Sequence, residues 1–307
     1  QPGTQSGYIL INQKTIIVRY LYLIGFFFII FSSSFGQINM NDSTVQVIGY
    51  WNNGEKQSYI ITNEKYKVKD DDTTSRELLK YTVDIEVVDS TANSYTINWF
   101  YHDYQLSSDN ELTKKLLAIT KDMIITVRTD EMGALQEIVN WKEIRDYIYK
   151  GTQMLKEETK DIPNMDQVIN QIENIYKTEE SIASSAVREM QQFYTYHGGK
   201  YKQGEEINAV MKAPNLYGGE PFDTQVTLWL DEINTEDNNS IIRMSQVVDS
   251  EQLTKTSYDY IVKMAETLKI PAPEYKDIPP LKNETRTASR IHGSGWIIYS
   301  VETREVS

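Results

Sequence analysis

An alternation of apolar and polar residues restricts the fold of this chain more than any other feature. Between residues 81 and 87, every second position is apolar and the positions between them are polar or charged. Successive side chains of a β-strand point to opposite faces of a sheet, so this pattern predicts a strand with one buried face. The alternation returns between Tyr95 and Tyr101, after a turn-rich stretch at 89–93. The two segments together predict a β-hairpin.

Other segments carry strand patterns or the apolar spacing that is typical of helices. Strands are expected at 57–69, 123–129, 134–140, 205–211, 224–232, 240–248, 284–291 and 296–306. Helices are expected at 111–120, at 250–268 and within 141–197, where a break at 161–164 separates two of them. We expect Asn140 to cap the first of these two helices, with Glu143 completing a capping box.

The order of these elements repeats along the chain. Residues 56–140 and residues 205–306 each give three strands, a helix and two strands. The string Asp109-Asn-Glu-Leu-Thr-Lys114 resembles Asp249-Ser-Glu-Gln-Leu-Thr-Lys255, and each opens the helix of its half. An internal duplication would explain these matches, although acidic residues favour helix starts in unrelated sequences too. We predict an α+β fold in which two similar β-β-β-α-β-β halves form a curved, mainly antiparallel sheet, with the connecting helices 141–197 packed on it.

The start of the chain has the three parts of a secretory signal. Lys14 and Arg19 precede an eleven-residue apolar run, and small residues follow at positions 34 and 36. We expect cleavage after Gly36, with an uncleaved anchor as the alternative. The apolar run is shorter than the ~20 residues that span a bilayer, so no stable membrane span is expected after cleavage.

The remaining chain, 37–307, is expected to be a single exported domain. Gln37 stands where a bacterial lipoprotein would need a cysteine, so we expect a protein without a lipid anchor, in the periplasm or on the cell surface. Residues 1–13 contain no initiating methionine and are interpreted as upstream translation.

The absence of cysteine and the acidic composition exclude several kinds of site. Without cysteine there are no disulfides, no thiolate metal sites and no cysteine nucleophile. The chain has 31 basic and 44 acidic residues and a formal charge of −13. Such a surface repels phosphate backbones, so we expect no nucleic-acid partner.

The layout of the two halves resembles the LolA-like lipoprotein carriers of bacterial envelopes. The hairpin motif Ser294-Gly295-Trp296 is similar to one found near the end of uncharacterised secreted bacterial proteins. The resemblance implies a curved half-barrel that holds apolar cargo. It transfers no functional residue to this chain, because it contains no diagnostic motif.

No recognised catalytic or metal-binding motif appears. None of the histidines, His102, His197 and His292, has a second histidine three or four positions away, as a zinc-binding helix requires. Ser294 lies between two glycines, but its flanks are predicted strands, whereas a nucleophile elbow joins a strand to a helix. We therefore predict no catalytic residue, no metal ligand and no cofactor.

These observations favour a non-catalytic protein of the cell envelope that binds an apolar or lipid ligand, a glycan or a partner protein. An exported hydrolase, with carboxylates brought together by the fold, is the alternative. The helices within 141–197 have a broad apolar stripe that includes Met165, Met190 and Phe193. Either packing on the sheet uses all of this stripe, or a surplus lines a pocket together with the aromatic residues of the strand between Tyr95 and Tyr101. The candidate ligand-binding residues are therefore Tyr95, Trp99, Tyr101, Met190 and Phe193.

Overall fold

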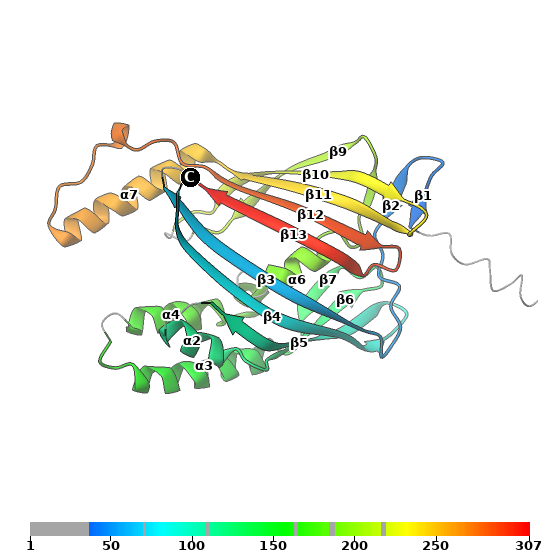
Figure 1. The fold of residues 1–307 in the computed structure, drawn as a ribbon, viewed down its shortest axis with the longest axis horizontal. Coiled ribbons are helices and arrows are strands. Elements are labelled where there is room, and N and C mark those ends of the chain that lie inside the picture. The colour runs from blue at the N-terminus through cyan, green and yellow to red at the C-terminus, as the bar shows by residue number, and fades with distance from the viewer. Residues whose placement is uncertain (1–36, 70–71, 108–110, 163–164, 184–187, 216–218) are drawn as a thin grey trace, which may run out of the picture.

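A computed structural model describes residues 37–69, 72–107, 111–162, 165–183, 188–215 and 219–307 (Figure 1). The predicted signal segment, 1–36, lies outside the described residues. Within the described part of the chain, no helix is long and apolar enough to cross a membrane.

The strands form three antiparallel sheets (Figure 1). The first five-stranded sheet contains, in spatial order, β3 (Lys56–Lys69), β4 (Asp72–Ser90), β5 (Ser94–Leu106), β6 (Ile124–Asp130) and β7 (Leu135–Ile138). The second contains β9 (Glu206–Ala213), β10 (Phe222–Asn234), β11 (Asn239–Val248), β12 (Asn283–His292) and β13 (Ile297–Val306). A small sheet joins β1 (Ile38–Asn39), β2 (Thr44–Gln46) and β8 (Lys200–Lys202).

The helices agree with the predicted positions with two exceptions: the long helix is divided, and a short 3-10 helix lies at 275–277, where no helix was predicted. They are α2 (Glu111–Ile119), α3 (Trp141–Glu158), α4 (Met165–Ile175), α5 (Glu179–Ser181), α6 (Arg188–Tyr194) and α7 (Ser250–Leu268), followed by the short 3-10 helix η2 (Tyr275–Asp277). The predicted stripe from residue 165 to 197 is interrupted after α4. There the hydroxyl of Thr178 accepts a hydrogen bond from the Ser181 amide, 3.1 Å away, and starts a new turn.

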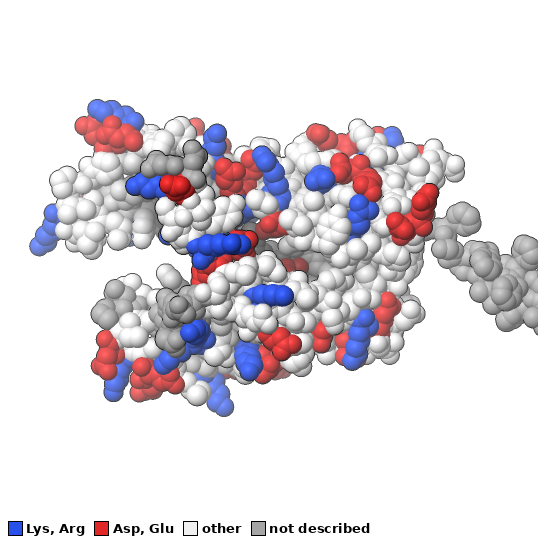
Figure 2. All heavy atoms as spheres, viewed as in Figure 1, with Lys and Arg blue, Asp and Glu red and all other residues white. Residues whose placement is uncertain are grey.

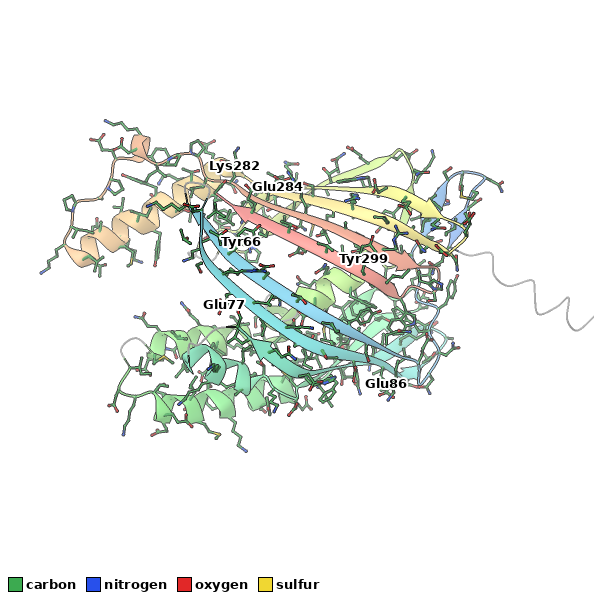
Figure 3. The ribbon with its side chains drawn as sticks, viewed as in Figure 1. Tyr66, Glu77, Glu86, Lys282, Glu284 and Tyr299 are labelled. Atoms are coloured by element: carbon green, nitrogen blue, oxygen red, sulfur yellow. The ribbon has the colours of Figure 1, made fainter. Side chains whose placement is uncertain are left out.

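The two five-stranded sheets curl together into a half-barrel. Their strands do not form one continuous ladder, as the prediction of a single sheet implied. The edge strands β3 and β13 lie side by side in Figure 1 without backbone pairing, and the hydroxyl of Tyr59 donates instead to the Ile297 carbonyl, 2.8 Å away. Both edge strands run from the end of the half-barrel near Glu86 and Tyr299 to the end near Tyr66 and Glu284 (Figure 3).

Each five-stranded sheet is a meander with one helix between its third and fourth strands, which is the predicted order of elements. The closing hairpins also agree in detail. In the first, Asp130 N donates to Ala134 O and Gly133 N to Asp130 O; in the second, His292 N donates to Trp296 O and Gly295 N to His292 O. Both turn glycines have positive φ angles, 88° and 83°. Each hairpin also has a register shift directly before the turn.

Both turns contact the extended segment 47–51, which precedes β3. Gly49 N donates to Met132 O of the first turn, and Tyr50 N donates to Ser294 O of the second. These carbonyls hold the same position in their turns, so the segment is fixed between two equivalent loops.

An aromatic cluster fills the half-barrel where the sheets meet. Trp51 lies 5.3 Å from Trp296 and 5.3 Å from His197, measured between ring centroids. Helix α6 lies inside the half-barrel (Figure 1) and joins both sheets. On one side, Trp99 Nε1 of β5 donates to the Tyr194 hydroxyl at 3.1 Å; on the other, Gln192 Nε2 donates to the Ser300 hydroxyl of β13 at 2.5 Å.

Helix α3 buries Ile144, Ile148 and Leu155, as its predicted stripe requires. The capping box expected at its start is absent, because the Asn140 side chain binds β6. Its Oδ1 accepts from Thr126 N at 2.8 Å, and its Nδ2 donates to Ile124 O at 2.9 Å. The hydrogen bonds of this amide to the edge of β6 therefore replace the expected cap of α3.

Candidate functional site

The five predicted ligand-binding residues come together in the main core. Trp99, Tyr101, Met190 and Phe193 are buried, and Tyr95 is half-buried. Trp99 and Phe193 meet edge to face, with ring centroids 5.3 Å apart. The Tyr95 hydroxyl donates to Gly49 O at 2.8 Å. Their side chains are thus engaged in contacts with other parts of the protein.

The three histidines occupy separate places. His197 is buried in the aromatic cluster, where burial lowers its pKa to about 4. His102 on β5 stacks on Phe100 and lies 3.2 Å from Asp84. His292 Nδ1 accepts from Ser294 N at 3.1 Å within the last hairpin turn, so this nitrogen serves the geometry of the turn. No three His, Asp or Glu side chains gather as a metal site in the described part of the chain.

A cavity of about 430 Å³ opens between α3 and the end of α4. This volume is in the range of about 300–1,000 Å³ that is typical of ligand sites. We call it the α3–α4 cavity. Its lining comes from two turns of α3 and from the last residues of α4 and those that follow, and consists of Arg145, Asp146, Ile148, Tyr149, Glu173, Asn174, Tyr176 and Lys177.

The packing of the two helices positions these side chains. Leu155 of α3 packs with Met165 and Ile169 of α4 in a small cluster of their own. This contact holds the helices together along one side, and the polar residues of both helices then line the cavity beside it. Ile148, which is buried, supplies an apolar portion of the lining.

Several polar groups of the α3–α4 cavity are already held in place. The Glu173 carboxylate accepts hydrogen bonds from Thr152 Oγ1 at 2.6 Å and from Gln153 Nε2 at 3.1 Å. The Arg145 guanidinium lies 5.4 Å from the Trp141 ring centre and donates to Asp146 at 2.8 Å. Lys177 has no ion-pair partner among the described residues. The cavity therefore offers fixed acceptors and donors together with an uncommitted ammonium group.

Tyr176 connects the α3–α4 cavity to a second group of residues inside the half-barrel. These are Tyr81, Tyr101 and Tyr104 from the sheet and Glu189 from α6, which with Tyr176 we call the tyrosine–glutamate cluster. Burial raises the pKa of all four tyrosine hydroxyls, and the negative charge of Glu189 raises it further. The pKa reaches about 12 for Tyr104 and Tyr176. All four hydroxyls are therefore protonated at neutral pH and able to donate.

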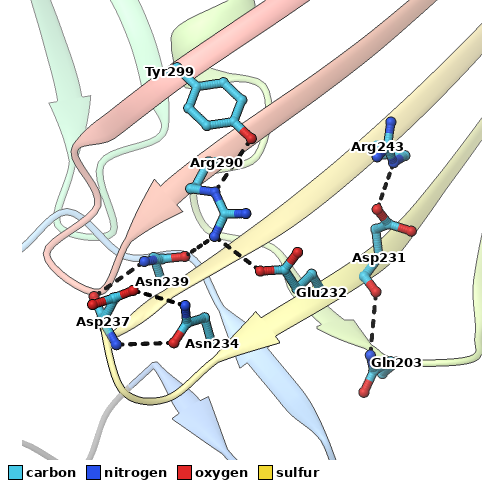
Figure 4. A network of polar contacts seen from close by, with 9 residues as sticks. All are labelled: Gln203, Asp231, Glu232, Asn234, Asp237, Asn239, Arg243, Arg290 and Tyr299. Atoms are coloured by element: carbon cyan, nitrogen blue, oxygen red, sulfur yellow. Dashed lines mark hydrogen bonds and ion pairs between the residues drawn. The ribbon is translucent and has the colours of Figure 1, made fainter.

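Three acidic residues at or beside the β10–β11 turn, Asp231, Glu232 and Asp237, have partners within the protein (Figure 4). Arg290 donates to Glu232 at 3.1 Å and to Asn239 at 2.6 Å, and it lies over the Tyr299 ring. Arg243 pairs with Asp231 at 2.7 Å. These contacts tie four strands together on one face of the second sheet, which is a structural role. Over the face drawn in Figure 2, acidic and basic side chains are interspersed.

No motif in the sequence predicts the α3–α4 cavity. Its only sequence signal is the placement of Tyr147 and Tyr149 outside the apolar stripe of α3, where both are exposed. Aromatic residues on the polar face of a helix are candidates for contact with a ligand or partner. No family model, no curated protein and no solved structure matches the chain.

Proposed function

We propose that this chain is a non-catalytic, exported protein of the cell envelope that binds a glycan in the α3–α4 cavity. One observation supports it most: tyrosine rings and fixed polar groups line the same cavity. A sugar ring presents C–H groups on its faces and hydroxyls around its rim. Tyr149 and Tyr176 supply apolar ring faces, while Glu173 and Asn174 supply hydrogen-bonding groups of the kind that orient such a ligand.

A glycan fits this lining better than a lipid does. Four of the eight lining residues are charged: Arg145, Asp146, Glu173 and Lys177. An acyl chain would cover these charged groups without forming hydrogen bonds to them, and burying an unpaired charge costs free energy. An apolar ligand between the sheets would have to displace Met190 and Phe193 from their packing, at about 2–5 kcal/mol for each side chain.

The signal-like segment supports the proposed location. The basic flank at Lys14 and Arg19, the apolar run and the small residues before Gln37 are typical of exported proteins. Glycans are abundant outside the cytoplasm, so export and glycan binding are mutually consistent.

We further propose that the two halves, 56–140 and 205–306, are copies of one ancestral unit. The two closing hairpins support this. Their hydrogen bonds, positive φ angles and register shifts match, and each feature lies the same number of residues from the start of the turn in both hairpins. Helices α3–α6 then form an insertion between the copies, which places the α3–α4 cavity outside the duplicated framework.

Binding is tested by titrating purified protein with a panel of envelope polysaccharide fragments, using isothermal calorimetry. Tyr149→Ala should weaken binding of the recognised glycan about tenfold, or ~1.4 kcal/mol, because a stacking surface is lost. Tyr147→Ala is the matched control, since Tyr147 is an exposed tyrosine of the same helix that does not line the cavity. It should bind as the unaltered protein does.

Two results would overturn the proposal. One is that Tyr149→Ala and the unaltered protein bind every panel member equally. The other is that the protein binds no glycan but co-purifies from envelope extracts with lipid, detected by native mass spectrometry, which would favour an apolar ligand instead.

A further inference from the structure

Strand β9 is an uncovered edge of the second sheet. It pairs with β10 on one side only, and seven of its eight residues are exposed. Ile207, Val210 and Met211 are 47%, 60% and 55% exposed, so apolar side chains are open to solvent on both of its faces. Long edges of this kind are templates for pairing with another chain.

The other edges of the two large sheets are either short or lie beside another edge strand, although β3 and β13 are also largely exposed. Strands β3 and β13 lie beside each other (Figure 1) and are linked by the contact from Tyr59 to Ile297. Strand β7 contains only four residues. β9 differs from these edges because it is eight residues long and, among the described strands, pairs only with β10.

We propose that β9 is a dimerisation surface, at which a second copy of this chain adds its own β9 in antiparallel orientation about a twofold axis at Ala209. In this register Glu206 of one copy faces Lys212 of the other, twice. Ile207 faces Met211, also twice, and Ala209 faces its own counterpart.

Charge complementarity selects this register. The outward face of β9 has Glu206, Asn208, Val210 and Lys212, and its inward face has Ile207, Ala209 and Met211, as the pairing with β10 shows. A shift by two residues in either direction removes Glu206 from Lys212. Opposite charges that face each other across strands stabilise a pairing, whereas mismatched ones do not.

The arrangement also extends an ion pair that is already present. Lys212 Nζ lies 2.7 Å from Asp223 of β10, directly across the ladder. Glu206 faces Trp229 in the same ladder and has no ion-pair partner among the described residues. Dimerisation would place each Lys212 between two carboxylates and would give each Glu206 a cation.

Because the chain has no cysteine, a single introduced thiol reports directly on the register. In an antiparallel pair, facing Cα atoms are about 4.5–5.5 Å apart, which is within the span of about 4.4–6.8 Å that a disulfide bridges. Ala209→Cys should therefore cross-link to its own counterpart. Met211→Cys is the matched control: it lies on the same face of the same strand, but its counterpart would be four residues away along the ladder.

The experiment compares the rate of disulfide-linked dimer formation for the two variants under mild oxidation, beside sedimentation velocity of the unaltered protein. We expect a dimer in sedimentation and cross-linking of Ala209→Cys at least about tenfold faster than of Met211→Cys, because only Ala209→Cys has a high effective concentration of its partner thiol. Ala209→Glu, which puts two like charges on the axis, should sediment as a monomer, while Val301→Glu on the exposed face of β13 should remain a dimer.

A monomer in sedimentation, or equal cross-linking rates for the two cysteine variants, would overturn the proposal. Glycan binding at the α3–α4 cavity is measured separately and does not depend on either result.

Discussion

The His197 Nε2 atom lies 2.9 Å from the carbonyl oxygen of Gly295, a residue of the last hairpin turn that is 98 positions further along the chain. The carbonyl can only accept, so Nε2 carries the proton. The ring is buried and stacks on Phe193 at a centroid distance of 5.6 Å. One imidazole therefore joins α6 to the closing hairpin of the second sheet.

This contact predicts a loss of stability in mildly acidic solution. Burial lowers the pKa of folded His197 to about 4, from an ordinary value of 6.5. Between these two pH values the unfolded chain binds a proton that the folded protein does not bind. The free energy of unfolding therefore has its full value above pH 6.5 and decreases as the pH drops toward 4. The full loss is about 3–4 kcal/mol, at ~1.4 kcal/mol for each pKa unit.

Urea unfolding at a series of pH values measures this loss. The same series on His197→Gln, which keeps a donor for the Gly295 carbonyl but cannot titrate, should be flatter between pH 6.5 and 4. Equal slopes for the two proteins would show that His197 is not the titrating group.

Glycine is required at position 295 by space as well as by conformation. Its φ is +83°, and an added Cβ would lie 2.5 Å from the Ile48 carbonyl oxygen. Gly54 has a φ of +80°, but an added Cβ there would meet nothing within 4 Å. Gly54→Ala should cost about 1 kcal/mol in unfolding free energy from backbone conformation alone.

Gly295→Ala should cost at least twice as much as Gly54→Ala, because the segment 47–51 must also move. Chemical denaturation of both variants checks the difference. If the two substitutions cost the same, the close approach of Gly295 to Ile48 is absent in solution.

The face of α3 that packs on the sheet is tested by Ile148→Asp. Ile148 is 1% exposed, so the substitution buries an unpaired carboxylate and should destabilise the protein by more than about 4 kcal/mol. Met154→Asp, at an exposed position of the same helix, should leave the melting temperature nearly unchanged. Circular dichroism melting curves distinguish the two outcomes, and a near-native curve for Ile148→Asp would contradict the assigned face.

Processing of the chain gives a further prediction. We expect the protein released from cells to begin at Gln37, because the small residues at 34 and 36 suit a signal peptidase. Intact-mass measurement with peptide mapping checks this. Recovery of peptides from the apolar run before residue 32 would show instead that the segment is retained.

Local pattern predicted most of the long strands and helices, but not the short strands β1, β2 and β8 or the division of the helix after α4. The helix predicted at 250–268 has those bounds in α7, and Asp249 caps it by accepting from Gln252 N at 2.8 Å. The closing hairpin and its glycine turn also formed as predicted. Such features depend on residues close in sequence, through the two-residue period of strands, the helical spacing of apolar residues and short-range capping.

Tertiary contacts decided the rest. Asn140 binds β6 rather than the helix that it precedes, because the edge of that strand offers a donor and an acceptor to the same amide. Of the aromatic residues predicted to bind a ligand, Tyr95 and Phe193 pack against Trp51, which lies in a segment without regular structure. The α3–α4 cavity needs two helices to meet. By itself, the sequence determined where apolar and polar residues alternate, which residues can cap a helix and where the chain turns, because these interactions involve residues close in sequence. Which segment covers each apolar face was decided only when distant segments packed together.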